Sequence, residues 1–230
     1  YIAEAIRLLK KYFSSICIEI YPLEVDEYKE LVNAGADSLT IYQETYNEEK
    51  YSKVHLSGPK RNFKFRLNAP ERVCKAGIHS IGTGALLGLY KWRSEAFFTG
   101  LHAAYIQEKF PSVEMSMSAP RIRPHAGSFN DIYEVNDKNI LQVILAYKLF
   151  LPRAGTNVTT REPREFRDSL IAIGVTKMSA GVSTEVGGHS LKDKGEGQFD
   201  TNDKRSVKEV YDRVKELGYN PVFKDFQSTL

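Results

Sequence analysis

Residues 75–84 have the sequence KAGIHSIGTG, and this stretch decides which fold the chain can adopt. A helical pattern ends just before Gly77, and a short β-type run begins a few residues later. Only glycine adopts the left-handed conformation that closes a helix at no steric cost, which explains its place in the unit. The same order of helix, glycine and strand returns at residues 33–39 and 172–176. Repeated units of this kind predict an α/β fold around a parallel sheet.

Six short β-type runs alternate with helical patterns, and several are almost wholly apolar, as buried parallel strands are. The expected strands are residues 16–21, 38–43, 80–83, 113–118, 157–160 and 176–179. An amphipathic helix is expected at residues 1–13, and another helix begins at an Asn68 N-cap followed by Pro70 and ends at Gly77. Such units suit a TIM-type barrel, although a complete barrel has eight strands in roughly 250 residues.

The composition predicts a globular domain with neither a membrane span nor a nucleic-acid surface. The 230 residues are 42% apolar, and 32 Lys and Arg stand against 29 Asp and Glu, for a net charge of +3. The basic residues are scattered among acidic ones, so nucleic-acid binding is not expected. No apolar run approaches the roughly 20 residues that cross a bilayer. We therefore expect a soluble, cytoplasmic protein.

The two cysteines, Cys17 and Cys74, lie far apart in the sequence. They build neither a disulfide framework nor a four-thiolate metal site, and such isolated cysteines are typical small core residues. The five histidines show no metal-ligand spacing. We therefore expect no metal site supplied by this chain.

Polar residues close each of the six expected strands. They are Glu19 and Tyr21, residues 43–45, residues 82–84, Ser116 and Ser118, residues 159–162, and residues 179–181. In a βα barrel the chemistry lies where the strands end and the next loops begin. Any single one of these residues could be an ordinary solvated strand end. Polar ends on six successive strands predict instead that these side chains converge at one opening of the barrel, which we call the mouth.

Glu19 is a carboxylate within the apolar run 16–21. A buried charge needs a partner, and Arg66 or Arg72 could supply one in a purely structural ion pair. The functional alternative is a carboxylate that accepts hydroxyl groups, such as those of a ribose. The spacing leaves both interpretations open.

Arg161 presents a similar choice. Its planar guanidinium suits the carboxylate of a substrate, whereas Glu162 or Glu44 could satisfy it within the protein. Neither interpretation is favoured by the spacing.

Two glycine-containing runs are candidates for close contact with a ligand. Residues 82–88 lack the Lys-Ser/Thr ending of a P-loop, so close approach of the backbone to a flat ligand is the better inference. Residues 181–188 follow the last strand, where barrels often hold a phosphate, but Glu185 opposes an anion.

Nine short motifs follow one another along nearly the whole chain. They are IEIYPL at 18–23, YQETY at 42–46, VHLSGPK at 54–60, RL at 66–67, GALLGL at 84–89 with WR at 92–93, SAPR at 118–121, TTRE at 159–162, MSAG at 178–181 and QF at 198–199. In this order the motifs resemble the tyrosine lyases of the radical S-adenosylmethionine superfamily. The ending GYNPVFKDF at 218–226 resembles the terminus of the members that serve thiamine synthesis.

The resemblance implies that residues 1–230 are the C-terminal part of a (βα)8 TIM-type radical S-adenosylmethionine barrel, with the biotin- and thiamine-synthesis-associated region at its end. It implies S-adenosylmethionine and a [4Fe–4S] cluster as cofactors and L-tyrosine as substrate. Cleavage of the Cα–Cβ bond would give p-cresol and 2-iminoacetate (dehydroglycine) for the thiazole ring. Thiazole synthase would be the protein partner.

The resemblance also implies roles for individual residues, although none is implied to be catalytic. Glu19 would bind the ribose of S-adenosylmethionine, and Arg66 would lie near its methionyl group. The backbone at Gly82, Gly84, Ala85 and Leu86 would lie against the adenine. Thr160 and Arg161 would bind the carboxylate of tyrosine, in a cavity lined by Tyr42, Gln43, Glu44 and Ser179.

The Cys-x3-Cys-x2-Cys loop of this family and its first barrel strands are not found in the 230 residues. Five of the expected strands would be later barrel strands and the sixth an added one. We therefore expect the chain alone to be inactive. An open sheet exposes an apolar edge, so we also expect the isolated chain to be poorly soluble or to pair with a partner; a monodisperse monomer that melts cooperatively would contradict this.

Two other functions remain open at this point. The chain could be a non-catalytic scaffold that binds thiazole synthase, which capture of that partner by the chain alone would indicate. It could also be a metabolic barrel that binds phosphate at Gly187 and Gly188 without any effect of S-adenosylmethionine.

Overall fold

The computed structural model describes residues 1–123, 131–185, 190, 197 and 200–226. One parallel sheet has the strand order β1-β2-β3-β4-β5-β6. The strands are β1 (Cys17–Ile18), β2 (Ser38–Thr40), β3 (Ser80–Gly84), β4 (Glu114–Ser118), β5 (Gly155–Val158) and β6 (Lys177–Met178). Each strand pairs with the next one along the chain, as in a (βα)8 barrel. Since β1 and β6 do not pair with each other, the described strands form an open part of a barrel.

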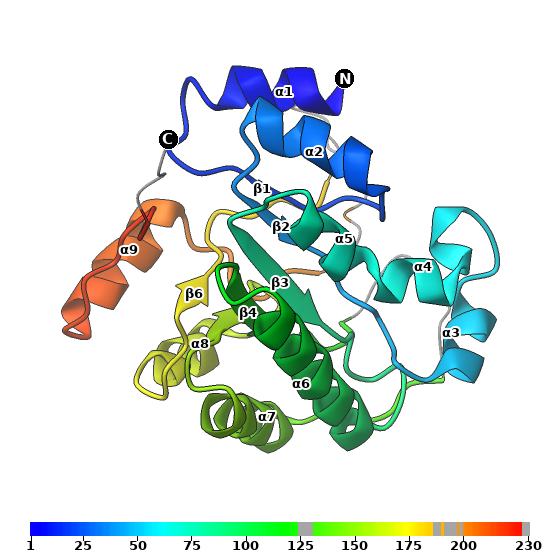
Figure 1. Ribbon diagram of the computed structural model, residues 1–230. Helices are drawn as coiled ribbons and strands as arrows, with labels where there is room; N and C mark the ends of the chain where they lie inside the picture. The colour runs from blue at the N-terminus through cyan, green and yellow to red at the C-terminus, as the bar shows by residue number, and fades with distance from the viewer. Residues whose placement is uncertain (124–130, 186–189, 191–196, 198–199, 227–230) are drawn as a thin grey trace.

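Helices lie between the successive strands, and α5, α6 and α7 pack against the sheet (Figure 1). They are α1 (Ile2–Leu9), α2 (Val25–Ala34), α3 (Glu48–Val54), α4 (Phe63–Leu67), α5 (Ala69–Lys75), α6 (Trp92–Lys109), α7 (Asp137–Phe150), α8 (Arg164–Ile171) and α9 (Val207–Glu216), with a 3-10 turn, η1, at Pro59–Arg61. Helix α6 packs against β3 and β4, and α7 against β5. Helix α9 lies at the β6 end of the sheet, on α8 (Figure 1).

The two faces of the sheet differ in chemistry. The face under the helices is apolar, and Leu39 and Ile81 are fully buried there. The opposite, inner face carries small and polar residues. A Cβ atom at Gly82 would lie 3.1 Å from Thr40 Oγ1 and 3.3 Å from Ser116 Oγ, so these residues meet on the inner face. Barrel interiors are usually filled by bulky branched side chains, whereas these inner-face positions carry small residues.

The expected α/β barrel fold and all six strand positions are confirmed, with differences at the ends. The first strand is short, as expected for an edge strand that pairs with one neighbour only. The fifth strand begins at Gly155, two residues earlier than expected (157 − 155). The first helix ends at Leu9, and Asn68 occupies the N-cap of α5 without capping it through its side chain.

A chain of buried ion pairs attaches the C-terminal region to the barrel. Arg167 of α8 is 0% exposed and donates to the carboxylate of Asp203 and to the carbonyl of Ser179, just after β6. Burial opposes ionisation, but hydrogen bonds from Arg205 and Arg167 together lower the pKa of Asp203 to about 2. The segment before α9 is therefore held on α8 by charge–charge contacts inside the protein.

The same network reaches α9 through Asp168. Its carboxylate accepts from Arg205 at 2.8 Å and from Arg213 of α9 at 2.9 Å.

Among the described residues, no helix has the length and the apolar character that a membrane span requires.

Glu71 links α5 to α6 near the surface. Its carboxylate lies 2.6 Å from Lys75 Nζ and 3.0 Å from Lys109 Nζ, and it accepts from the Tyr105 hydroxyl at 2.6 Å. The hydrogen bonds from Lys75, Tyr105 and Lys109 lower the pKa of Glu71 to about 2.

We expect the contribution of Glu71 to stability to depend on pH. Its folded-state pKa lies below the ordinary value of 4.5, so the stabilisation is complete above that pH and is lost as the pH falls toward 2. Urea unfolding should show that Glu71→Gln destabilises the chain at pH 6 and progressively less below pH 4. Glu108→Gln, at an exposed position of α6, serves as control. A Glu71→Gln effect that is independent of pH would contradict the ion-pair interpretation.

Candidate functional site

The predicted polar residues lie at the carboxyl ends of the parallel strands, on the inner side of the open sheet. Glu19 follows β1, Tyr42 and Glu44 follow β2, Arg161 follows β5 and Ser179 follows β6. Parallel strands bring these ends to one edge, so residues from distant parts of the sequence share one mouth. Acidic and basic groups both face this mouth.

Glu44 and Arg66 form the centre of the mouth. Glu44 Oε1 lies 3.2 Å from Arg66 Nη2 and 3.2 Å from Lys60 Nζ. Arg66 also donates from Nε to the Tyr42 carbonyl at 2.6 Å. Glu44 has a backbone φ of 70°, and it is the non-glycine residue with positive φ in the described part of the chain.

Arg66 keeps one hydrogen-bond donor without a partner. The side chain is 5% exposed, and among the described residues its Nη1 has no acceptor. A buried, unpaired guanidinium nitrogen is costly unless a ligand or water accepts from it. Arg66 can therefore bind a carboxylate or another acceptor that enters the mouth.

Glu19 differs from its expected buried position. The strand ends at Ile18, and solvent reaches the Glu19 side chain from the open side of the sheet. The surrounding walls still displace part of its water, and this desolvation, followed by the negative charge of Glu44, raises the pKa of Glu19. Arg66 is bonded to Glu44 rather than to Glu19, and Arg72 donates to the carbonyl of Leu23.

Arg161 faces the same group of charges. Desolvation lowers the pKa of its guanidinium, while Tyr42, Glu44 and Glu19 act against this shift. Glu162, one of its expected internal partners, instead pairs with Arg121 deep in the protein. A guanidinium in a partly dry mouth is suited to the carboxylate of a small molecule.

The backbone from Gly82 to Leu86 lies close to its neighbours. A Cβ atom at Gly84 would lie 2.6 Å from the Ser118 carbonyl oxygen and 3.0 Å from the Tyr42 ring, so only glycine fits there. Ala85 is buried, and the Leu86 amide donates to the Glu44 carbonyl at 2.8 Å. Burial raises the pKa of Tyr42 to about 12, which keeps its phenol protonated.

The remaining predicted residues are more deeply placed. The Thr160 amide donates to Ser179 Oγ at 3.0 Å, and the Thr160 carbonyl accepts from the amide of Asn202. Gln43 is 3% exposed, and neither of its side-chain amide atoms has a partner among the described residues. Thr160 and Ser179 thus connect the mouth to the C-terminal region.

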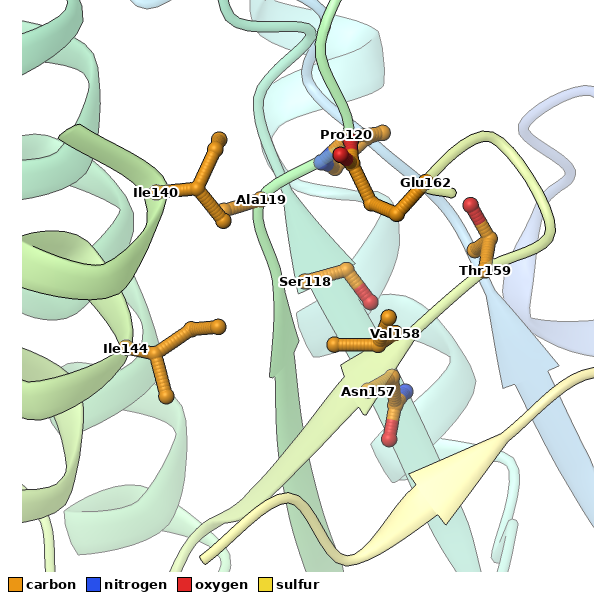
Figure 2. A pocket seen from close by; sticks show the side chains of 9 residues that line it. All are labelled: Ser118, Ala119, Pro120, Ile140, Ile144, Asn157, Val158, Thr159 and Glu162. Carbon is orange, nitrogen blue, oxygen red and sulfur yellow. The ribbon is translucent and has the colours of Figure 1, made fainter. Parts of the chain in front are cut away.

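A small cavity lies beside the mouth, between α7 and the strands β4 and β5. Figure 2 shows Ile140 and Ile144 on α7 pointing toward the strands that carry Ser118 and Val158. Its volume of about 10 Å³ leaves room for roughly one water molecule. This cavity is therefore too small to hold a cofactor or substrate.

Sequence reasoning named Ser118 among the polar strand ends without giving it a role, and it did not single out Lys60 or Asn157. Ser118 Oγ and Asn157 Oδ1 are buried without partners among the described residues, and Asn157 Nδ2 donates to Ser116 Oγ at 3.1 Å. Lys60 reaches Glu44 from the turn η1. The alternation of small and polar residues in β4 and β5 is the sequence signal that points to Ser118 and Asn157.

The described residues offer no ligand set for a metal cluster. Within them there is no group of three or more His, Cys, Asp and Glu side chains placed to hold a metal ion. Cys74 is buried in α5 as expected, whereas Cys17 is exposed, so the expectation of a core position is wrong for Cys17. The alternative phosphate site at Gly187 and Gly188 lies outside the described residues.

A family match and two curated relatives agree on what this chain is similar to. The family described as Biotin and Thiamin Synthesis associated domain matches residues 118–220. The 2-iminoacetate synthase of Escherichia coli is 35% identical over 223 residues, which are 96% of this chain and 59% of that protein. The 2-iminoacetate synthase of Salmonella typhimurium gives the same identity and coverage. The chain therefore spans about three fifths of the length of these relatives.

Solved structures show the same fold. A crystal structure of HydG, a maturase of the FeFe-hydrogenase, has a TM-score of 0.88 at 32% identity and covers 97% of this chain and 50% of that chain. HydG from Carboxydothermus hydrogenoformans has a TM-score of 0.83 at 32% identity, with 97% and 53% covered. The crystal structure of methylornithine synthase has a TM-score of 0.73 at 19% identity and covers 96% of this chain and 63% of that chain. At this identity the likeness shows a shared fold only.

Proposed function

Because the chain is a homologue of the 2-iminoacetate synthases along nearly its whole length, we propose that it is the later part of a radical S-adenosylmethionine lyase. The substrate would be L-tyrosine, and cleavage of its Cα–Cβ bond would yield 2-iminoacetate and p-cresol. The observation that carries this proposal is the mouth itself, where Glu19, Glu44, Arg66 and Arg161 meet and Arg66 keeps a buried donor unpaired.

The cofactor side of the site would be formed by the first three strands. S-adenosylmethionine, together with a reduced [4Fe–4S] cluster, supplies the radical chemistry when bound. Glu19 would accept hydrogen bonds from ribose hydroxyls, and Arg66 would donate to the methionyl carboxylate from its unpaired nitrogen. Residues 82–86, with glycine where a side chain would clash, would lie against the adenine.

The substrate side would be formed around β5 and β6. Arg161, with Thr160 beside it, would bind the carboxylate of L-tyrosine. Tyr42, Gln43, Glu44 and Ser179 would line the cavity around the rest of the substrate. Radical chemistry requires a closed, water-poor site in which a few fixed polar contacts hold cofactor and substrate.

The [4Fe–4S] cluster does not fit the described residues, which hold no suitable group of ligands. Its ligands must therefore come from elsewhere if the proposal is correct. Association with thiazole synthase and a place in the cytoplasm belong to the same proposal.

The decisive experiment begins with the reading frame upstream of Tyr1. We expect a Cys-x3-Cys-x2-Cys motif there, and we expect the full-length protein to release p-cresol from L-tyrosine and S-adenosylmethionine under anaerobic, reducing conditions. A full-length variant with alanine at the three cysteines is the control and should release none. Full-length protein with an intact cluster that cleaves S-adenosylmethionine but forms no p-cresol would exclude tyrosine as the substrate.

A further inference from the structure

We propose that Glu95 of α6 is a positioning residue that holds the segment carrying Glu44 in its active shape. The functional value of Glu44 rests on the proposed function, whereas the positioning itself does not. The Glu95 carboxylate binds Thr45 and Tyr46, not the groups assigned to cofactor or substrate.

Glu95 is a buried carboxylate that binds the backbone and side chain of the next segment. It is 1% exposed, accepts from Thr45 Oγ1 at 2.7 Å and accepts from the Tyr46 amide at 2.8 Å. Thr45 is itself fully buried. Within the described part of the chain, no Lys, Arg or His forms an ion pair with Glu95.

A buried carboxylate without a cation is costly, so its presence calls for an explanation. An apolar side chain of similar volume would fill the same space at lower cost. The two hydrogen bonds that Glu95 accepts both come from residues that directly follow Glu44. We infer that the carboxylate is present because it fixes this segment.

Glu44 is the residue that needs fixing. A non-glycine residue at φ 70° is in an unfavourable conformation, which persists only where its surroundings impose it. The Glu44 carbonyl is held by the Leu86 amide at 2.8 Å, and Glu95 holds the two residues that follow. Between these two restraints the Glu44 carboxylate lies 3.2 Å from Arg66 Nη2.

Tyr46 adds a further restraint on the same segment. Its hydroxyl and His102 Nδ1 are 2.9 Å apart, and its ring stands edge-on to the His102 ring. Burial lowers the pKa of His102 to about 4, so the ring is neutral at physiological pH. Helix α6 therefore restrains the segment through both Glu95 and His102.

Hydrogen–deuterium exchange in the full-length protein, with neither S-adenosylmethionine nor L-tyrosine added, tests the proposal. Glu95→Met keeps the side-chain length and removes both acceptors, and we expect exchange in residues 44–46 to rise at least 10-fold while the middle of α6 stays protected. Glu95→Gln keeps one carbonyl acceptor and should give a smaller rise. Glu71→Met is the matched control, because it removes a carboxylate of α5 that accepts from Tyr105 of α6, and it should leave exchange at residues 44–46 unchanged.

Two results would overturn the proposal. One is unchanged exchange at residues 44–46 in Glu95→Met. The other is an equal rise throughout the sheet, because this would make Glu95 a general packing residue.

Kinetics of the full-length protein separate this inference from the proposed function. If Glu95 acts through Glu44, the double variant Glu95→Met/Glu44→Gln should lose no more kcat/KM for L-tyrosine than Glu44→Gln alone. Fully additive losses would contradict action through Glu44. If Glu95→Met loosens residues 44–46 but leaves tyrosine kinetics unchanged, the positioning role stands and the assignment of Glu44 to the substrate site fails.

Discussion

Asp203→Ala should lower the free energy of unfolding of this chain by about 3–5 kcal/mol. The reason is that Arg167, at 0% exposure, would lose its carboxylate and keep its charge inside the protein. Removing one partner of a buried pair costs more than the pair contributes, since the remaining charge stays desolvated. Urea denaturation followed by circular dichroism measures this difference.

Two further variants make the result specific. Asp212→Ala removes the exposed partner of Lys208 in α9 and should change stability by less than about 1 kcal/mol. The double variant Arg167→Met/Asp203→Leu removes both buried charges and should be more stable than Asp203→Ala alone. If Asp203→Ala costs no more than Asp212→Ala, the network does not hold the C-terminal region in place.

Arg161→Met should lower kcat/KM for L-tyrosine by roughly 100-fold in the full-length protein, mainly through KM. The expected loss corresponds to one charge-assisted pair with the substrate carboxylate, which is worth about 2–3 kcal/mol. Arg161→Lys keeps the charge and loses the planar pair of donors, so we expect an intermediate loss. Steady-state release of p-cresol measures all three proteins.

The controls separate substrate binding from folding and cofactor binding. Arg164→Met, at an exposed position three residues further along the chain (164 − 161), should leave the kinetics unchanged. Affinity for S-adenosylmethionine should also be unchanged in Arg161→Met. Unaltered tyrosine kinetics in Arg161→Met would mean that another residue binds the substrate carboxylate.

Glu19 shows where reasoning from local sequence was wrong. The apolar run 16–21 predicted a buried carboxylate, yet the strand ends at Ile18 and solvent reaches Glu19. A strand at the edge of a sheet has one paired neighbour, and its length depends on that neighbour rather than on its own residues. The alternative of a structural ion pair between Glu19 and Arg66 is also wrong, because Arg66 pairs with Glu44 from the next segment of the fold.

The fifth strand and the charge pairs illustrate the same limit. Glycine is unfavourable in strands, so the pattern placed the strand after Gly155, yet Gly155 opens β5. A Cβ atom there would lie 2.9 Å from Thr176 Oγ1, in the residue just before β6. Likewise, the sequence could not tell that Glu162 pairs with Arg121 instead of Arg161.

By itself the sequence determined the fold class, the six strand positions, and the kinship with the 2-iminoacetate synthases, which the relatives confirm. These properties are local: glycine caps, apolar runs and short motifs are readable from neighbouring residues. The tertiary structure decided which charges meet, as Glu44 meets Arg66 and Asp203 meets Arg167. It also decided that Glu95 stands behind Glu44, because burial and hydrogen bonding depend on segments that only folding brings together.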